Sequence, residues 1–272
     1  MQKEGIVVIR GGGDLATGIV QKFNRSGFKL LVLETEKPTA IRRSVAICEA
    51  VYTGYASVED ISCAKIENLS ELDECFRKGI IPLLVDPGGL SIQQLKPATV
   101  IDAILAKHNL GTRKDMSPIT IGLGPGFCAG EDVDVVIETM RGHDLGRLIF
   151  KGYALPNTGI PGDINGKSSQ RVIRAPVGGI VNHIRSIGDV VEAEEAICAI
   201  SGETVTVPFK GLLRGLIREG LQVPKGLKIA DIDPRLDVNW RTISEKARCI
   251  GGAALEAFFY LSNLTNNMEE QR

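Results

Sequence analysis

The chain has 272 residues, of which 43% are hydrophobic and 24% charged, so it can bury a sizeable core and is expected to form two domains. This composition excludes a disordered protein. Lys and Arg total 32 against 33 for Asp and Glu, and the resulting charge of −1 offers no positive field for nucleic acid or anionic lipid. Because no apolar run reaches the roughly 18 residues of a membrane span, we expect a cytoplasmic protein that binds neither nucleic acid nor membrane.

The six cysteines are scattered without a CxxC pair, a spacing that favours reduced thiols over a disulfide framework or a zinc site. Glu131, Asp132 and Asp134 could offer oxygen ligands to a divalent cation. The sequence as a whole predicts no bound metal.

From residue 5 to about 150, short β-branched runs alternate with helical stretches, which is the pattern of parallel strands covered by helices. Strands are expected at 6–9, 29–33, 81–85, 99–104 and 119–123. Helices are expected at 16–24, 40–50 and 69–78. We therefore predict an α/β domain over residues 1–150 with a Rossmann-like parallel sheet.

Residues 151–170 are rich in glycine and proline, which indicates a connector. Beyond it the sequence repeats at an offset of 32 residues, from Pro176 and Pro208 to Ile200 and Ile232. Two copies are too few for a solenoid, so residues 171–236 are expected to close as a two-fold barrel that resembles the barrel-sandwich hybrid of biotinyl and lipoyl domains. An unrelated small barrel is the alternative. Residues 237–272 regain helical periodicity and are predicted to pack back on one of the domains.

The first strand runs into a glycine turn and then a helix, which is the order of the dinucleotide-binding fingerprint. Such glycines let the chain bend tightly and approach a pyrophosphate at the helix N-terminus. Glu34 ends the second strand, where a carboxylate can accept from ribose hydroxyls, and favours NAD over NADP. A turn that binds nothing is the alternative. The expected cofactor-binding residues are Gly11, Gly12, Gly13, Ala16, Thr17 and Glu34.

Polar and glycine residues follow other strands of the predicted sheet. The carboxyl ends of parallel strands meet at one edge, where ligands bind in such folds. We therefore predict a substrate pocket at this edge, with a capping role as the alternative for Asp102. The expected pocket residues are Asp86, Gly88, Asp102, Gly124, Gly126, Glu131 and Asp132.

A dense group of functional side chains follows the apolar run 133–137. Arg141 could clamp an anionic substrate through two oxygens, and His143 could move a proton near neutral pH. A structural role is the alternative for His143. The candidate catalytic residues are His143, Arg141 and Glu138, expected to face the glycine turn across the sheet edge.

The barrel-like region lacks one residue that carriers of biotin or lipoate need, a lysine at the tip of the hairpin that joins their halves. That junction reads Ser201-Gly202-Glu203-Thr204, and no lysine occurs from Ser168 to Phe209. We therefore expect a docking or lid module without covalent modification.

Three segments together resemble the YqeB family: Ile9 to Gly18, Gly124 to Arg147, and the barrel-like tail. That family is described as selenium-dependent molybdenum hydroxylase system, or molybdenum cofactor maturation, proteins. The resemblance spans essentially the whole chain and is most specific over 124–147. It implies a bacterial cytoplasmic accessory protein that acts with selenium-dependent molybdenum hydroxylases, and a first domain similar in kind to that of XdhC-type factors. It implies a pathway and no particular reaction.

Three hypotheses of function follow, and they leave open whether the chain is an enzyme. The first is a maturation factor that binds NAD, another dinucleotide or a molybdopterin nucleotide, with a client hydroxylase and other maturation proteins as partners. The second is an NAD-dependent oxidoreductase on a small anionic substrate, with Arg141 as clamp and His143 as acid and base. The third is a docking scaffold without catalysis. The sequence shows no clear second catalytic pair, which favours the first or the third, and a homo-oligomer is possible in each.

Overall fold

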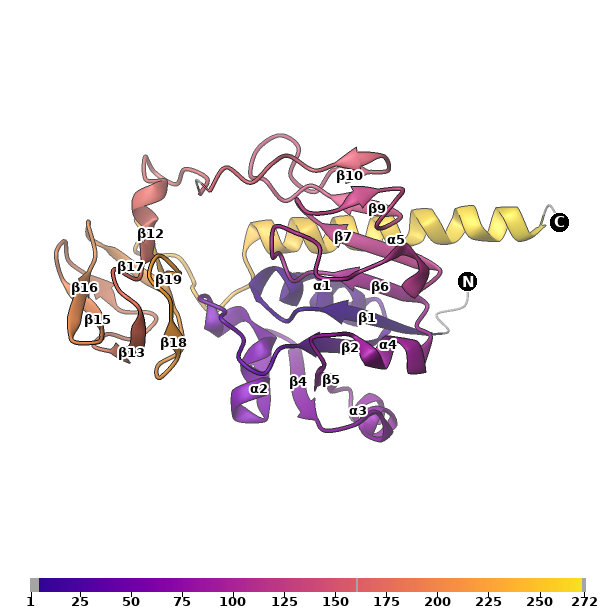
Figure 1. Cartoon of the computed structure of the whole chain (residues 1–272), viewed down its shortest axis with the longest axis horizontal. Coiled ribbons are helices and arrows are strands. Elements are labelled where there is room, and N and C mark those ends of the chain that lie inside the picture. Colours follow the sequence, from indigo (N-terminus) through magenta and orange to yellow (C-terminus); the bar gives the residue numbers. More distant parts are fainter. Residues whose placement is uncertain (1–4, 160, 271–272) are drawn as a thin grey trace. The chain divides into compact units, whose positions relative to one another are not determined.

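The computed structural model describes residues 5–159 and 161–270, which fall into two compact units (Figure 1). The first unit comprises Met1–Pro38, Ala46–Asn157 and Ile243–Arg272, and the second comprises Thr39–Val45 and Thr158–Thr242. Residues 39–45, predicted in the first domain, belong to the second unit, and the predicted connector 151–170 is divided between the two units after Asn157. The C-terminal helix belongs to the first unit. Residue 160 of the predicted connector lies outside the described residues.

A mixed sheet forms the centre of the first unit, and the predicted α/β class is thereby confirmed. Within the described residues it has nine strands in the order β10-β9-β7-β6-β1-β2-β5-β4-β3. The six central strands are parallel, and β4 continues this direction, whereas β3 and β10 are antiparallel edges. The bounds are β1 Ile6–Arg10, β2 Lys29–Glu34, β3 Tyr55–Val58, β4 Ile61–Ile66, β5 Ile81–Val85, β6 Thr99–Asp102, β7 Ile119–Leu123, β9 Val135–Ile137 and β10 Leu148–Ile149.

The order of the central strands fixes where a ligand could bind. Numbered along the chain, β1, β2, β5, β6, β7 and β9 lie in the order 3-2-1-4-5-6, which is that of doubly wound nucleotide-binding sheets. The order in which strands are added to the sheet reverses between the parallel neighbours β1 and β6, so the crevice expected for a ligand lies beyond their carboxyl ends. The glycine turn follows β1 at this point, and Ala103 follows β6.

The helices of the first unit are α1 (Asp14–Arg25), α2 (Ala50–Thr53), α3 (Leu72–Arg77), α4 (Leu90–Leu95) and α5 (Glu245–Glu270). The 3₁₀ turns of the chain are η1 Arg43–Val45, η2 Ile47–Glu49, η3 Leu69–Glu71, η4 Lys114–Met116 and η5 Ser169–Arg171. The helix predicted over 40–50 was wrong. The carbonyl O of Ile41 accepts from Leu216 N at 2.9 Å, and Arg43 Nε donates to Leu216 O at 2.7 Å, so this segment is held by the second unit and cannot close helical bonds.

Helix α5 runs alongside α1 (Figure 1). A Cβ on Gly18 of α1 would lie 2.3 Å from the carbonyl O of Ala247, and one on Gly251 of α5 would lie 2.4 Å from that of Gly18. Further along, Phe23 of α1 packs edge-on against Phe258 of α5 at 5.9 Å. The two helices therefore run parallel, and the first turns of α1 and α5 lie at the same end of the helix pair.

The second unit consists, within the described residues, of two four-stranded antiparallel sheets, β12-β19-β17-β14 and β16-β15-β13-β18. Its strands are β12 Val172–Arg174, β13 Gly179–His183, β14 Val190–Val191, β15 Ala196–Ile200, β16 Glu203–Thr206, β17 Gly211–Leu216, β18 Gln222–Val223 and β19 Lys228–Asp233. The starts of β13, β14 and β15 are each 32 residues before those of β17, β18 and β19. The pairing repeats as well: β13 pairs with β15 and β18, and β17 pairs with β19 and β14.

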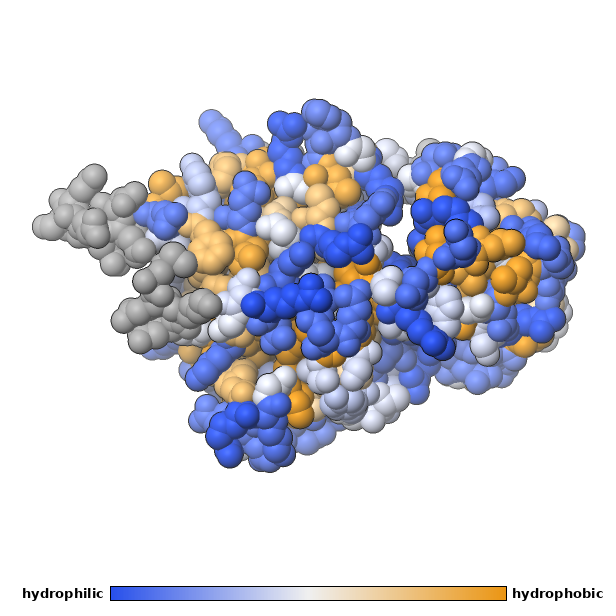
Figure 2. All heavy atoms as spheres, turned by 180° about the vertical axis from the view of Figure 1, so that it is seen from behind, coloured by the Kyte–Doolittle hydropathy of each residue, from blue (hydrophilic) through white to orange (hydrophobic). Residues whose placement is uncertain are grey.

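Figure 2 shows hydrophobic residues grouped on the face of the second unit that is turned to the viewer. Ile180, Ile184 and Val190 of this unit are each about half exposed.

None of the helices in the described ranges combines the length and the apolar character that crossing a membrane requires.

Candidate functional site

The glycine turn after β1 contains three glycines, which differ in how much room the surrounding structure leaves for a side chain. Gly11 has φ +96°, and a Cβ there would lie 2.9 Å from the carbonyl O of Ala103. A Cβ on Gly12 would lie 3.1 Å from Cys48. Gly13 has an ordinary extended backbone, with φ −67° and ψ −178°, and a Cβ there would meet nothing within 4 Å. The fold therefore requires glycine at Gly11, leaves little room for a side chain at Gly12 and does not require glycine at Gly13.

The open space over Gly13 lies at the N-terminus of α1. Gly13 is the N-cap residue, and no side chain caps the helix there. Amides in the first turn of a helix have no intrahelical acceptor, and the helix dipole is positive at this end. An anion could accept from these amides, although the carboxylate of Asp14 lies in the same first turn and must point away from it.

Glu34 holds the glycine turn from the neighbouring strand. Its Oε2 accepts from Gly12 N at 2.8 Å and its Oε1 from Thr35 N at 2.8 Å. Burial raises the pKa of this carboxyl, and the two backbone bonds oppose that effect. One amide of the turn is therefore already satisfied by the protein.

Thr17 and Ala16 serve the local structure. Thr17 Oγ1 donates to Gly13 O at 2.8 Å and accepts from Ile47 N at 3.1 Å. Ala16 is 1% exposed and lies inside the unit. Their predicted contact with a cofactor stays a prediction.

A buried ion network lies under the same edge of the sheet, and the sequence analysis missed its central residue. Arg10, the last residue of β1, is 1% exposed and donates to Pro87 O at 3.0 Å and Leu110 O at 3.3 Å. It also donates to Thr112 Oγ1 and lies 3.5 Å from Asp102 Oδ2. Arg10 thereby ties together the loops that follow β5 and β6.

Asp102 belongs to this network, as its alternative capping role suggested. Thr112 Oγ1 donates to Asp102 Oδ2 at 2.6 Å, and Ile104 N donates to Oδ1 at 3.1 Å. Burial raises the pKa of Asp102, and the bonds to Thr112 and Ile104 together with the charge of Arg10 counteract the rise. The bond from Ile104 also explains why the strand predicted to reach residue 104 ends at Asp102.

Two other predicted carboxylates are engaged by backbone amides. Asp86 accepts from Leu90 N at 3.0 Å and from Ser91 N at 2.8 Å, and so satisfies the start of α4. Glu138, 2% exposed, accepts from Met140 N at 2.7 Å and from Leu155 N at 2.8 Å. Glu138 therefore closes the loop after β9, which leaves it poorly placed for proton transfer.

Glu131 and Asp132 do not lie with the other predicted pocket residues. They occupy the turn that returns the chain to the amino end of β9, beside β8 (Cys128–Ala129), which pairs with β11 (Gly152–Tyr153). The next residues confirm this placement, because Asp134 N donates to Thr120 O near the start of β7. Asp132 Oδ2 accepts from Cys128 N at 2.8 Å. The prediction that both line a pocket at the carboxyl edge of the sheet was wrong, since they lie at the amino end of β9.

Gly124 and Gly126 shape the loop after β7. Gly124 has φ +70° and faces Thr139, and Gly126 has φ +116° and faces the backbone of His108. Both have a structural requirement for glycine. His143 is exposed, and within the described residues it forms no hydrogen bond or ion pair with Arg141 or Glu138.

Three cationic residues lie at the carboxyl edge of the sheet: Arg141, Lys246 and Lys107. Arg141 forms an ion pair with Glu245 in the first turn of α5. Burial and the charge of Arg141 lower the pKa of the neighbouring Lys246 to about 8, with a smaller contribution from Lys107. Lys107, which follows β6, is exposed, and partial desolvation lowers its pKa. The sequence analysis found Arg141 but not the two lysines.

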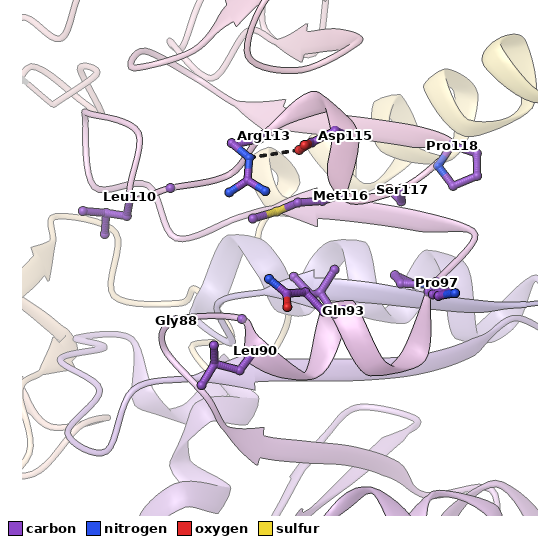
Figure 3. Close-up of a pocket in the computed structure, with 14 residues that line it drawn as sticks. Gly88, Leu90, Gln93, Pro97, Leu110, Arg113, Asp115, Met116, Ser117 and Pro118 are labelled. Atoms are coloured by element: carbon purple, nitrogen blue, oxygen red, sulfur yellow. Dashed lines mark hydrogen bonds and ion pairs between the residues drawn. The ribbon is translucent and has the colours of Figure 1, made fainter.

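A cavity of about 650 Å³ lies near this site, between α4 and the connection from β6 to β7 (Figure 3). Gln93 of α4 and Met116 face it from opposite sides. Arg113 lines the cavity, and its Nε lies 3.0 Å from Asp115 Oδ1 in an ion pair. The charge of this guanidinium is therefore already paired with a carboxylate. It includes Gly88 of the predicted pocket and is lined by Gly88, Gly89, Leu90, Ile92, Gln93, Lys96, Pro97, Leu110, Gly111, Arg113, Asp115, Met116, Ser117 and Pro118.

The described part of the chain contains no group of three or more His, Cys, Asp or Glu side chains arranged to bind a metal ion.

The fold and site define an α/β protein with a glycine turn at the reversal point of a doubly wound sheet. No family model matches the chain. The chain is 47% identical, over 257 residues, to the protein from Escherichia coli strain K12 described as uncharacterized protein YqeB. The match covers 94% of this chain and 48% of that protein, so the chain spans about half the length of this relative. The similarity supports the predicted resemblance to the YqeB family.

Among solved structures, a crystal structure of an aspartoacylase family protein from Mesorhizobium loti matches at 14% identity. The TM-score is 0.30, and the match covers 85% of each chain. This likeness is too distant to carry an inference about function.

Proposed function

We propose that the first unit is a Rossmann-like domain that binds a phosphate-bearing ligand at the N-terminus of α1. The candidate ligands are NAD, another dinucleotide, a nucleotide or a molybdopterin nucleotide. The observation that carries this proposal is Gly13, where the fold needs no glycine and leaves open space over the first helical turn. In a doubly wound sheet this is where a pyrophosphate approaches the backbone. The cations at the same edge favour an anionic ligand.

We further propose that the chain serves the maturation of selenium-dependent molybdenum hydroxylases, as the resemblance to the YqeB family implies. In this proposal it is a cytoplasmic accessory protein that contacts a client hydroxylase and other maturation proteins. The second unit would be a barrel-sandwich hybrid domain, which the repeated pairing at an offset of 32 residues supports. Its half-exposed apolar side chains favour docking of a client, so a docking scaffold is the second candidate function.

The NAD-dependent oxidoreductase gains no support from the site. Its acid and base would be His143, which is exposed and, in the described part of the chain, forms no hydrogen bond with Arg141, the residue expected to bind the anionic substrate. Glu138 is committed to two backbone amides.

We expect Gly13→Asp to lose binding of NAD and ADP by about tenfold or more while the folded protein stays as stable as the wild type. The carboxylate would fill the open space and repel a phosphate, yet aspartate is a favoured N-cap residue. Isothermal titration calorimetry and thermal melting measure the two effects. Asn263→Asp, on an exposed part of α5, adds the same charge elsewhere and is the control. If Gly13→Asp binds NAD and ADP as the wild type does, the glycine turn is not the binding site. If the wild type binds neither NAD nor ADP at millimolar concentration, the proposal that the first unit binds a nucleotide is wrong.

A further inference from the structure

Lys107 and Lys246 are the remaining polar groups at this edge that no local function explains. Lys107 lies in the connection after β6, and Lys246 in the first turn of α5. The chain brings them together because β6 borders β1, and α5 packs along α1, which follows β1. Lys246 is close enough for its pKa to respond to the charges of Lys107 and of Asp14, the residue that follows Gly13.

Neither ammonium is held by a direct bond. Within residues 5–159 and 161–270, no hydrogen bond or ion pair to Lys107 Nζ or Lys246 Nζ is formed, whereas Arg141 is paired with Glu245. The carboxylates of Asp14 and Glu138 act on Lys246 through their charge, without such a bond to its Nζ.

The backbone around Lys107 is also unusual. Lys107 has φ +70° and Leu105 has φ +61°, a region that residues with a side chain rarely adopt. Such strain persists where the surrounding structure requires one particular arrangement, and it concentrates at binding sites. The two positive φ values show that the connection after β6 adopts one particular conformation at Leu105 and Lys107.

We propose that Lys107 and Lys246 bind the second phosphoryl group of the ligand, so that the site selects a pyrophosphate-bearing ligand over a monophosphate. This rests on the proposed function, in which the first phosphoryl group lies over Gly13. Two unpaired ammonium groups near a guanidinium repel one another, and an added dianion relieves that repulsion. A pyrophosphate carries its second charged group one bridging oxygen from the first, which fits a ligand shared between the turn and the lysines.

The charges that face Lys246 predict how binding depends on pH. Asp14 of α1 and Glu138 after β9 raise its pKa, and burial, Arg141 and Lys107 lower it, with the result that the pKa is about 8. Glu245 adjoins it on α5 and is paired with Arg141. The ammonium is therefore largely charged at pH 7 and largely neutral at pH 9, so affinity for a pyrophosphate should fall as pH rises through 8.

The test compares ADP, AMP and inorganic pyrophosphate as probes by calorimetry on the full chain. We expect the wild type to bind ADP about tenfold or more tightly than AMP at pH 7, as a charge-assisted bond would give. Lys107→Gln and Lys246→Gln should reduce this preference strongly, and Lys151→Gln, at an exposed lysine of the same unit, should preserve it. In Lys246→Arg the preference should remain and no longer decline between pH 7 and pH 9, because arginine stays charged.

A stability measurement separates ligand binding from a structural role. Lys246→Gln removes a partly buried charge whose pKa is lowered, so its melting temperature at pH 7 should rise, whereas loss of a structural ion pair would lower it. If Gly13→Asp abolishes ADP binding while both lysine variants keep the wild-type preference for ADP, the lysine proposal is wrong and the proposed function stands. If the wild type binds neither ADP nor pyrophosphate, both are wrong.

Discussion

Arg10→Met is expected to lower the free energy of unfolding by about 3–5 kcal/mol, the cost of breaking a buried ion pair by removing one partner. Arg10 is 1% exposed and Asp102 2% exposed, so water cannot replace the missing donor. The substitution also frees the carbonyl groups of Pro87 and Leu110. Urea unfolding followed by circular dichroism measures the loss. Arg113→Met, which breaks an exposed pair with Asp115, is the matched control and should cost less than about 1 kcal/mol.

The same variant should acquire a distinctive pH dependence. Without the guanidinium, the pKa of the buried Asp102 rises further above that of the unfolded chain. Below the unfolded value the carboxyl is protonated in both states and causes no penalty. As pH rises through the higher folded value, the variant loses stability, so its deficit should be smallest near pH 4 and largest at neutral pH.

A second substitution tests whether the charge itself is responsible. Asp102→Asn in the Arg10→Met background removes the unpaired carboxylate, so the double variant should recover part of the lost stability, and the double-mutant cycle should show a clear interaction between the two sites. Equal stability losses in Arg10→Met and Arg113→Met, or no recovery in the double variant, would mean that Arg10 contributes through packing alone.

Much of the first unit could be predicted because short stretches of the sequence determine its strands and its glycine turn. The strands over 81–85 and 119–123 are apolar runs bounded by turn residues, and the structure has them with the same bounds. The glycine turn was recognisable because a tight bend after a strand restricts the residue type. The β3–β4 hairpin was not predicted, and the helix expected over 40–50 was replaced by a segment that the second unit holds through Leu216. Contacts between residues so distant in sequence leave no local pattern.

The candidate site was harder to predict than the fold, because its contacts join residues that are distant in sequence. Residue type identified carboxylates at Asp86, Asp102 and Glu138, but the structure shows each of them satisfied by nearby backbone amides. Arg10 looked like an ordinary end of a strand, because its partners come from the loops after β5 and β6, which are distant in sequence. Lys246 could not be linked to the glycine turn until the packing of α5 on α1 was known.

That packing depends on small residues, so Gly18→Ala is expected to lower stability by about 1–3 kcal/mol. Alanine normally stabilises a helix relative to glycine by about 0.5–1 kcal/mol. At Gly18, however, the added Cβ would lie 2.3 Å from the carbonyl O of Ala247, and backbone on both sides leaves no flexible atom to move aside. The helices must separate, and the cost of lost packing outweighs the gain in helix propensity.

Gly252→Ala provides the matched control, because it lies in α5 where a Cβ would meet nothing within 4 Å. It should be neutral or stabilising by about 0.5–1 kcal/mol. Gly18→Ala should also weaken binding of ADP, since moving α5 carries Lys246 away from the glycine turn, whereas Gly252→Ala should leave binding unchanged. Thermal melting and calorimetry give both readouts. If the two alanine variants are equally stable, α1 and α5 do not meet at these glycines, and the placement of Lys246 beside the glycine turn is lost with that contact.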